Sequence, residues 1–156
     1  MTTHNAYNSV EDGFSLPNQN YAIKGQLKAG VRALMVDVYN DNGVNVVHHV
    51  FPELGVLTFD EVLSDIKTFL DFNPSEIITL ILESYVTADQ IESSLRELDL
   101  LGYLYAHHIE DEWPTLQELI DLNTRLIIFS DVDDASDEQS WSHYLWSHAV
   151  ETDYAN

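Results

Sequence analysis

The chain has no cysteine, few basic residues and no long apolar segment. Without cysteine, neither disulfide bonds nor thiolate chemistry can operate. Lys and Arg together number only 6 among 156 residues, against 27 Asp and Glu, so the formal net charge is −21. Such a charge repels nucleic acids and anionic lipid surfaces at long range and attracts divalent cations. No apolar run reaches the ~20 residues that a membrane-spanning helix needs. We therefore expect no nucleic-acid partner and at most peripheral membrane contact.

The length is sufficient for one domain with a hydrophobic core. Apolar periodicity and capping signals predict strands at 31–39, 44–49, 76–83 and 125–130, and helices at 18–27, 58–71, 88–100, 115–122 and 138–148. Asn42-Gly43 predicts a hairpin turn, and Thr58 with Glu61 predicts a capping box. The almost uninterrupted apolar run at 76–83 is typical of a parallel strand that is covered on both faces. The alternation of strands and helices predicts an α/β fold with a parallel sheet.

Five polar side chains are expected to converge at the carboxyl ends of these strands. Asp37 and Glu83 each lie near the end of a strand, and alternation places each on one defined face. His49 ends the return strand of the hairpin, and His4-Asn5 would end a preceding strand. Enzymes with parallel α/β folds place their chemistry at this end of the strands. Two imidazoles and two carboxylates there suit acid–base catalysis beside a cation.

The positions of the basic residues also favour a cation. Arg32 and Arg125 lie at strand starts, and the four other basic residues lie on predicted helices. No guanidinium is therefore expected beside the five side chains. An anionic substrate at such a site needs its charge neutralised in the transition state, and a hard cation held by oxygen ligands can do this.

Five segments of the chain occur together, and in this order, in one known family. They are His4-Asn5-Ala6-Tyr7, residues 30–37, the His48-His49 pair, residues 69–78 and residues 113–116. With them the chain resembles the X domain of phosphatidylinositol-specific phospholipases C, especially the calcium-dependent microbial members. The resemblance implies a (β/α)8 TIM-barrel-like fold. About four βα units are predicted where a barrel needs eight, so residues 1–156 are expected to form a single partial domain, the N-terminal half of the barrel.

The resemblance also implies roles for the site residues. His4 would deprotonate the inositol 2-hydroxyl or stabilise the transition state, and His49 would protonate the leaving diacylglycerol oxygen. Asn5, Asp37 and Glu83 would hold Ca²⁺ against the phosphate of a phospholipid or another phosphodiester substrate.

Three positions distinguish the chain from members of this family. Metal-independent bacterial relatives have an arginine at the position of Tyr39 and a lysine at that of Glu83, so both residues favour the calcium-dependent group. Calcium-dependent animal members have a further glutamate at the position of Met35, so we expect either weaker metal binding here or a ligand supplied by a residue outside this chain.

The remaining histidines and one acidic stretch are interpreted as structural or solvated. His48 is expected to be the structural member of its pair, with its side chain on the face opposite to His49. His107 and His108 are expected in a loop or at the surface, and His143 and His148 on the surface of the last helix. The stretch 131–134 lacks the spacing of a calcium loop and is expected to be solvated.

Two other functions remain open. The chain could be a non-catalytic remnant that binds phosphate or lipid headgroups, which Met35 and the short length favour, or an inactive fragment of a catalytic domain. Retention of both His4 and His49 favours a phosphoric diester hydrolase. No signal peptide is visible before His4, although the family resemblance favours a secreted protein. The sequence predicts neither the headgroup specificity nor the oligomeric state.

Overall fold

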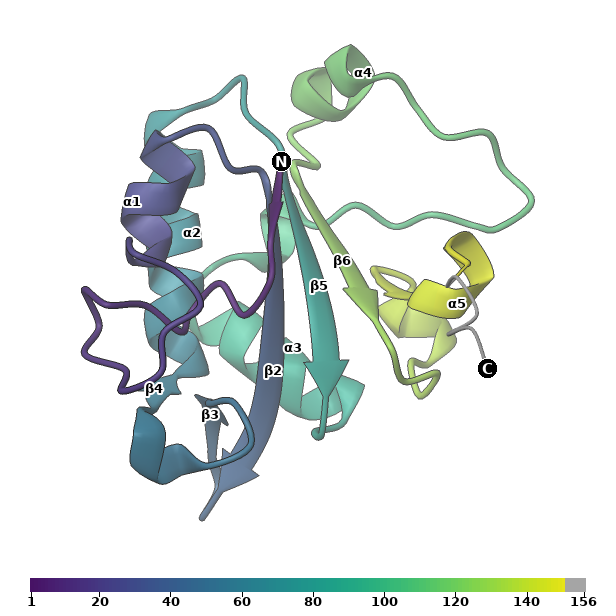
Figure 1. The fold of residues 1–156 in the computed structure, drawn as a ribbon. Coiled ribbons are helices and arrows are strands. Elements are labelled where there is room, and N and C mark those ends of the chain that lie inside the picture. Colours follow the sequence, from purple (N-terminus) through teal and green to yellow (C-terminus); the bar gives the residue numbers. More distant parts are fainter. Residues whose placement is uncertain (151–156) are drawn as a thin grey trace.

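A computed structural model describes residues 1–150 of the chain (Figure 1). The strands are β1 (Thr2–Thr3), β2 (Ala33–Asp41), β3 (Val44–Val47), β4 (Leu57–Thr58), β5 (Ile78–Ser84), β6 (Leu126–Ser130) and β7 (Ser142–Tyr144). The helices are α1 (Ile23–Lys28), α2 (Phe59–Phe72), α3 (Ala88–Glu97), α4 (Leu116–Asp121) and α5 (Leu145–His148). Short 3-10 turns occupy Pro52–Leu54, Leu101–Tyr103 and Asp137–Gln139.

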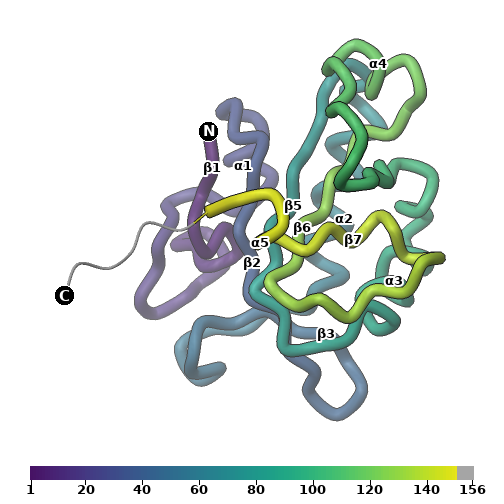
Figure 2. Tube along the Cα trace, turned by 90° about the vertical axis from the view of Figure 1, so that its right-hand side faces the viewer, coloured from purple at the N-terminus to yellow at the C-terminus, as the bar shows by residue number. Residues whose placement is uncertain are grey.

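The strands form one mixed sheet of seven, in the order β4-β3-β2-β5-β6-β7, with β1 also paired to β2. Strands β1, β2, β5, β6 and β7 run parallel to one another, whereas β3 pairs antiparallel with both β2 and β4. Figure 2 views the sheet from its β7 edge. Parallel strands joined through helices make this the predicted α/β fold, with the architecture of an incomplete (β/α)8 barrel.

Local sequence signals explain several elements. Asn42 and Gly43 both have positive φ, 52° and 91°, as the type I′ hairpin turn between β2 and β3 requires. Thr58 caps α2, and its capping box with Glu61 is present. Both features confirm the sequence prediction and fix the hairpin and helix that flank the segment carrying His48 and His49.

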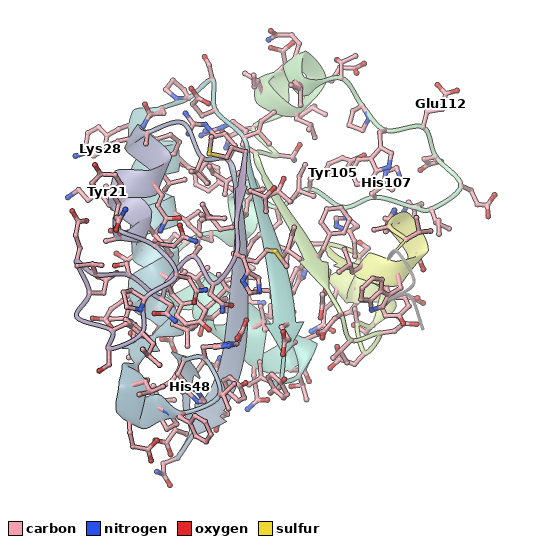
Figure 3. All side chains as sticks on the ribbon, in the orientation of Figure 1. Tyr21, Lys28, His48, Tyr105, His107 and Glu112 are labelled. Carbon is pink, nitrogen blue, oxygen red and sulfur yellow. The ribbon has the colours of Figure 1, made fainter. Side chains whose placement is uncertain are left out.

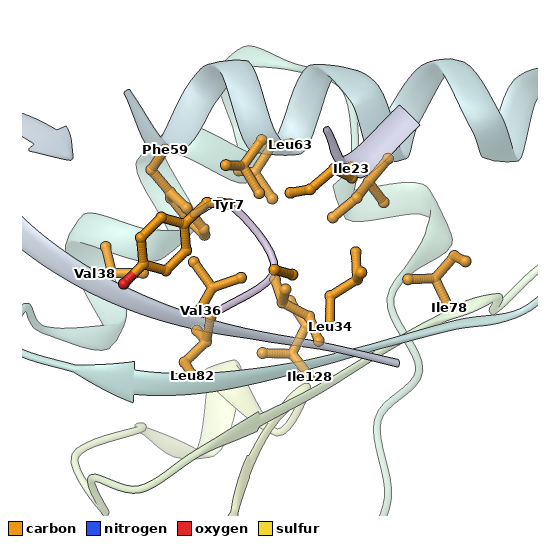
Figure 4. Packing of buried hydrophobic residues seen from close by; sticks show 14 of the residues in the cluster. Tyr7, Ile23, Leu34, Val36, Val38, Phe59, Leu63, Ile78, Leu82 and Ile128 are labelled. Carbon is orange, nitrogen blue, oxygen red and sulfur yellow. The ribbon is translucent and has the colours of Figure 1, made fainter. Parts of the chain in front are cut away.

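The core lies between the sheet and helices α1, α2 and α3. Leu34, Val36 and Val38 of β2 are fully buried, and they pack toward Phe59 and Leu63 of α2 (Figure 4). On the other face of β2 and β5, Met35 and Ile81 are only partly buried and Glu83 is exposed, whereas Asp37 is buried. In a complete barrel that second face is the interior, and here it is the less covered side of the sheet.

Two helices are present but begin later than predicted. The first is the helix at 18–27, because α1 begins only at Ile23 and its N-cap is Ala22. The side-chain oxygen of Asn18 accepts hydrogen bonds from Asn5 and Asn8 instead of capping a helix. The second is the helix at 138–148, because Ser142–Tyr144 form the edge strand β7 and only Leu145–His148 are helical. Within residues 1–150, no helix is both long and apolar enough to cross a membrane.

Candidate functional site

His49 is held by Asp37, and Asp37 is held by the core. His49 Nδ1 lies 3.2 Å from Asp37 Oδ2, and the hydroxyl of Tyr7 donates to the same oxygen at 2.9 Å. Asp37 is only 5% exposed and Tyr7 is fully buried, while about half of the His49 side chain is exposed. Because a carboxylate only accepts hydrogen bonds, the His49 proton sits on Nδ1 and leaves Nε2 free. Burial, and then the charge of Asp37, raise the pKa of Tyr7, so it remains a donor.

His4 and Asn5 lie on the segment that continues β1 beside β2. Thr3 pairs with Leu34, and the amide of Ala6 donates to the carbonyl of Met35 at 2.9 Å. Asn5 has a positive φ of 47° and is 1% exposed. Its Nδ2 donates to Asn18, but its buried Oδ1 has no hydrogen-bond partner among the described residues. The His4 side chain is exposed, and its backbone carbonyl accepts from Gln19 at 2.7 Å.

Glu83 lies beside Asp37. The two residues are register partners in the parallel strands β2 and β5, so their side chains share the barrel-interior face. The Tyr85 hydroxyl donates to Glu83 Oε1 at 2.5 Å. This bond raises the pKa of Tyr85, because the neutral phenol is the donor. The sequence analysis gave Tyr85 no role.

Three aromatic rings form a stack next to these groups. His48 stacks on Tyr39 with a centroid distance of 4.0 Å, and Tyr85 stacks on the opposite side of Tyr39 at 4.2 Å. The predicted opposite orientation of His48 and His49 is wrong. Both rings contact side chains on one face of β2, because β3 ends at Val47 and strand alternation no longer applies beyond it. Burial lowers the pKa of His48.

Asp131 is also placed differently from the prediction. Its amide donates to the carbonyl of Leu82 at 3.1 Å, and its Oδ1 accepts from the amide of Ser84 at 2.8 Å. Burial raises the pKa of Asp131, and the nearby charges of Glu83 and Asp37 act in the same direction. Asp131 therefore caps the end of β5 and belongs to the site's electrostatics; it is not simply solvated. Its position directly after strand β6 was the available sequence signal.

The two arginines lie at the opposite end of the strands. Arg32 pairs with Glu76 at 2.6 Å, and Arg125 donates to the backbone carbonyls of Leu70, Asn73 and Glu76. The site consequently presents carboxylates, imidazoles and phenols without a guanidinium. Among residues 1–150, no three His, Asp or Glu side chains lie close enough together to bind one metal ion. The oxygen donors available to a hard cation are the carboxylates of Asp37 and Glu83 and the unpartnered carboxamide oxygen of Asn5, a chemistry that Ca²⁺ accepts.

A second histidine cluster lies well apart from this site. In Figure 3, His48 lies near the strand ends, whereas Tyr105 and His107 lie beside β6 and α5. His107 stacks on Trp113, with centroids 3.9 Å apart, and the rings of His143 and His148 lie within 6.3 Å of that of His107. His143 is not on a helix surface as predicted, because it is 3% exposed in β7. His107 is in a loop, as predicted, but is itself buried.

This architecture is a half-barrel of the (β/α)8 type with a histidine–carboxylate pair at the carboxyl ends of its parallel strands. The PI-PLC X family (PI-PLC X 1) matches residues 1–156, and the chain belongs to that family. A PI-PLC X domain-containing protein of Arabidopsis thaliana is 29% identical over 98% of this chain and 40% of its own length. The solved phosphatidylinositol-specific phospholipase C of Listeria monocytogenes superimposes with a TM-score of 0.59 and 22% identity, over 83% of this chain and 49% of that chain.

The chain thus spans between two fifths and one half of these two proteins. This coverage agrees with the incomplete barrel seen in the fold. A further relative, 27% identical over 81% of the chain, is named as an uncharacterized secreted protein of Arthroderma benhamiae.

Proposed function

We propose that the chain is the N-terminal part of a phosphodiesterase of the phospholipase C type, which cleaves the headgroup phosphodiester of a phospholipid. The observation that carries this proposal is the Tyr7–Asp37–His49 arrangement. It fixes one tautomer of a half-exposed histidine at the carboxyl end of parallel strands. A histidine in this setting serves as a proton donor or acceptor, and the carboxylate behind it sets its orientation.

The proposed reaction uses the two histidines as a base and an acid. His4 removes the proton from a headgroup hydroxyl, the hydroxyl oxygen attacks phosphorus, and the bond from phosphorus to the diacylglycerol oxygen breaks. His49 enters the step as an imidazolium, gives its Nε2 proton to the leaving oxygen and ends neutral with the other proton still on Nδ1, so the products are a cyclic phosphate and diacylglycerol. Asp37 keeps His49 Nδ1–H oriented throughout, because the hydroxyl of Tyr7 and the surrounding core hold its carboxylate.

We infer that Asn5, Asp37 and Glu83 hold Ca²⁺. The support is the buried Asn5 oxygen that lacks a partner and the adjacent carboxylates on β2 and β5. A calcium ion would neutralise phosphate charge where the chain has no guanidinium. With only three protein ligands the affinity is expected to be weak.

One observation favours a second candidate, a non-catalytic remnant that binds phosphate or lipid headgroups. No cluster of three metal-binding side chains occurs in the part of the chain that the structure describes, and Met35 contributes no oxygen to the site. A remnant would bind headgroups without cleaving them. The secreted relative supports action outside the cell for either candidate.

Turnover separates the two candidates. The protein to be assayed is the complete barrel, in which residues 1–156 are joined to the strands that close it. It is incubated with phosphatidylinositol vesicles and millimolar Ca²⁺, and the products are followed by phosphorus NMR. Release of a cyclic phosphate that is lost in His4→Ala and His49→Ala supports the enzyme. Vesicle binding without any product in the complete barrel refutes it and supports the remnant. The isolated chain is expected to show little or no turnover.

A further inference from the structure

Tyr39 is the middle ring of the aromatic stack beside the site. It occupies the same face of β2 as Asp37, two residues further along the strand. Its ring is covered on one side by His48, at 4.0 Å and 11°, and on the other by Tyr85, at 4.2 Å and 8°. The three nearly parallel rings come from three different segments: strand β2, the residues after β3 and the residues after β5.

Each outer ring of the stack is coupled to a proposed functional side chain. His48 is followed directly in the chain by His49, whose Nδ1 contacts Asp37 at 3.2 Å. Tyr85 donates its hydroxyl to Glu83 at 2.5 Å. Movement of the His48 ring would therefore displace His49, and movement of the Tyr85 ring would displace Glu83. Both outer rings pack against the ring of Tyr39.

Without the stack, the segment that carries His49 has few other restraints. Strand β3 ends at Val47, Val50 has a positive φ of 58°, and Val50 and Phe51 are 57% and 60% exposed. The contact between His49 and Asp37 is made by a side chain that is half exposed. A hydrogen bond of this kind competes with water, so a neighbouring packed ring that restricts the conformations of the segment adds to the hold of Asp37 on His49.

We propose that Tyr39 is a positioning residue, which holds His49 through His48 and Glu83 through Tyr85. This inference deepens the proposed function, because it concerns the same site and rests on His49 and Glu83 being its working groups. On β2, one face supplies both supports: Asp37 fixes the ring of His49, and Tyr39 fixes the residue before it.

The test uses residues 1–156 as they are and needs no turnover. Nitrogen-15 NMR of the imidazole rings near pH 7.5 reports which nitrogen of His49 carries the proton. In the wild-type chain and in Tyr39→Phe, which keeps the stack, we expect His49 to be in the Nδ1–H form with a detectable Nδ1–H proton. In Tyr39→Leu, which removes the stack, we expect that proton signal to be lost and the ring to shift toward the Nε2–H form that free imidazole side chains favour.

Two further variants separate positioning from general damage. His48→Ala removes one outer ring without altering β2, and should reproduce the loss of the His49 signal even if Tyr39→Leu fails to fold. Tyr85→Phe keeps the stack and removes only the bond to Glu83, so it should leave the His49 signal unchanged while shifting the carbon-13 resonance of the Glu83 carboxylate.

The proposal is overturned if His49 keeps its wild-type tautomer in a folded Tyr39→Leu or in His48→Ala. It is equally overturned if Tyr39→Phe loses the signal, because the phenol hydroxyl and not the stacked ring would then be responsible. A complete barrel that shows the NMR signature but no phosphodiester cleavage would refute the proposed function and leave the positioning role of Tyr39 intact.

Discussion

The stability of this chain should fall between pH 6.5 and pH 4 because of one buried histidine. His143 Nδ1 lies 2.7 Å from the carbonyl of Ile128, and its Nε2 accepts the backbone N–H of His107 at 3.1 Å. Only a neutral ring with its proton on Nδ1 can make both bonds. Protonation would turn Nε2 into a donor facing another donor, in a strand where His143 is 3% exposed.

Burial lowers the pKa of His143 from the ordinary 6.5 to about 4, and the neighbouring His148 and His107 act in the same direction. In the unfolded chain the imidazole has its ordinary pKa, so between these two values the unfolded state binds more protons than the folded state. The stabilisation is therefore complete above pH 6.5 and is lost as the pH falls toward 4. The difference of about 2.5 in pKa corresponds to roughly 3 kcal/mol of unfolding free energy.

Urea denaturation from pH 7.5 to 4.5 measures this effect against two variants. At pH 7.5, His143→Gln should be less stable than the wild type by about 1–3 kcal/mol, because buried hydrogen bonds are lost. Glutamine does not titrate, so the stability of this variant should not follow the fall seen in the wild type. The difference in unfolding free energy between the two proteins should therefore shrink as the pH falls. His108→Gln, a change in the exposed neighbour of His107, should follow the wild-type curve. The hydrogen-exchange protection factor of the His107 amide, which corrects for the pH dependence of intrinsic exchange, gives a local readout and should fall at low pH in the wild type alone. A gap between wild type and His143→Gln that stays constant down to pH 4.5 would refute this reasoning.

The remaining predictions concern the proposed site. In the complete barrel, His4→Ala and His49→Ala should each lower turnover by roughly 10²–10⁴, the usual contribution of a positioned acid or base, and an unchanged rate would remove that residue from the mechanism. Asp37→Asn should lower turnover and also cost about 1–3 kcal/mol in urea unfolding, because a buried donor loses its charged acceptor. Millimolar Ca²⁺ should support turnover and a chelator should abolish it, so full turnover in excess chelator would contradict the calcium site. Asn5→Leu should weaken calcium binding measured by calorimetry. Phe51→Ser should weaken sedimentation with zwitterionic vesicles without changing hydrolysis of a soluble phosphodiester, because Phe51 is 60% exposed close to His49.

The parts of the fold that sequence reasoning predicted correctly depend on short-range patterns. Alternation along β2 placed Leu34, Val36 and Val38 against the helices and Asp37 on the other face, and all three apolar residues are fully buried. The hairpin turn at Asn42-Gly43 and the cap at Thr58 are equally local, because each depends on the chemistry of a few adjacent residues.

The errors came from contacts between distant residues. A polar side chain suited to an N-cap, Asn18, bonds instead to Asn5 and Asn8, and α1 starts later. The segment around His143 has helical spacing but pairs with β6 as an edge strand, because the sheet offers it an open neighbour. Similarly, the hydroxyl of Tyr7 reaches Asp37 across 30 positions, and no periodicity in the sequence predicts such a contact.

The geometry of the site follows from one local turn. The Asn42-Gly43 turn fixes the antiparallel register that pairs Val38 with Val47. That register determines where β3 ends. It therefore also determines that His48 meets Tyr39 and that His49 meets Asp37. A slip of one residue would turn Asp37 and the residues that alternate with it toward the opposite face of the sheet. Since Asp37 Oδ2 also accepts from the buried hydroxyl of Tyr7, the register that orients His49 is the same register that completes the core. Substitutions that loosen this hairpin should therefore reduce stability and disorder His49 together.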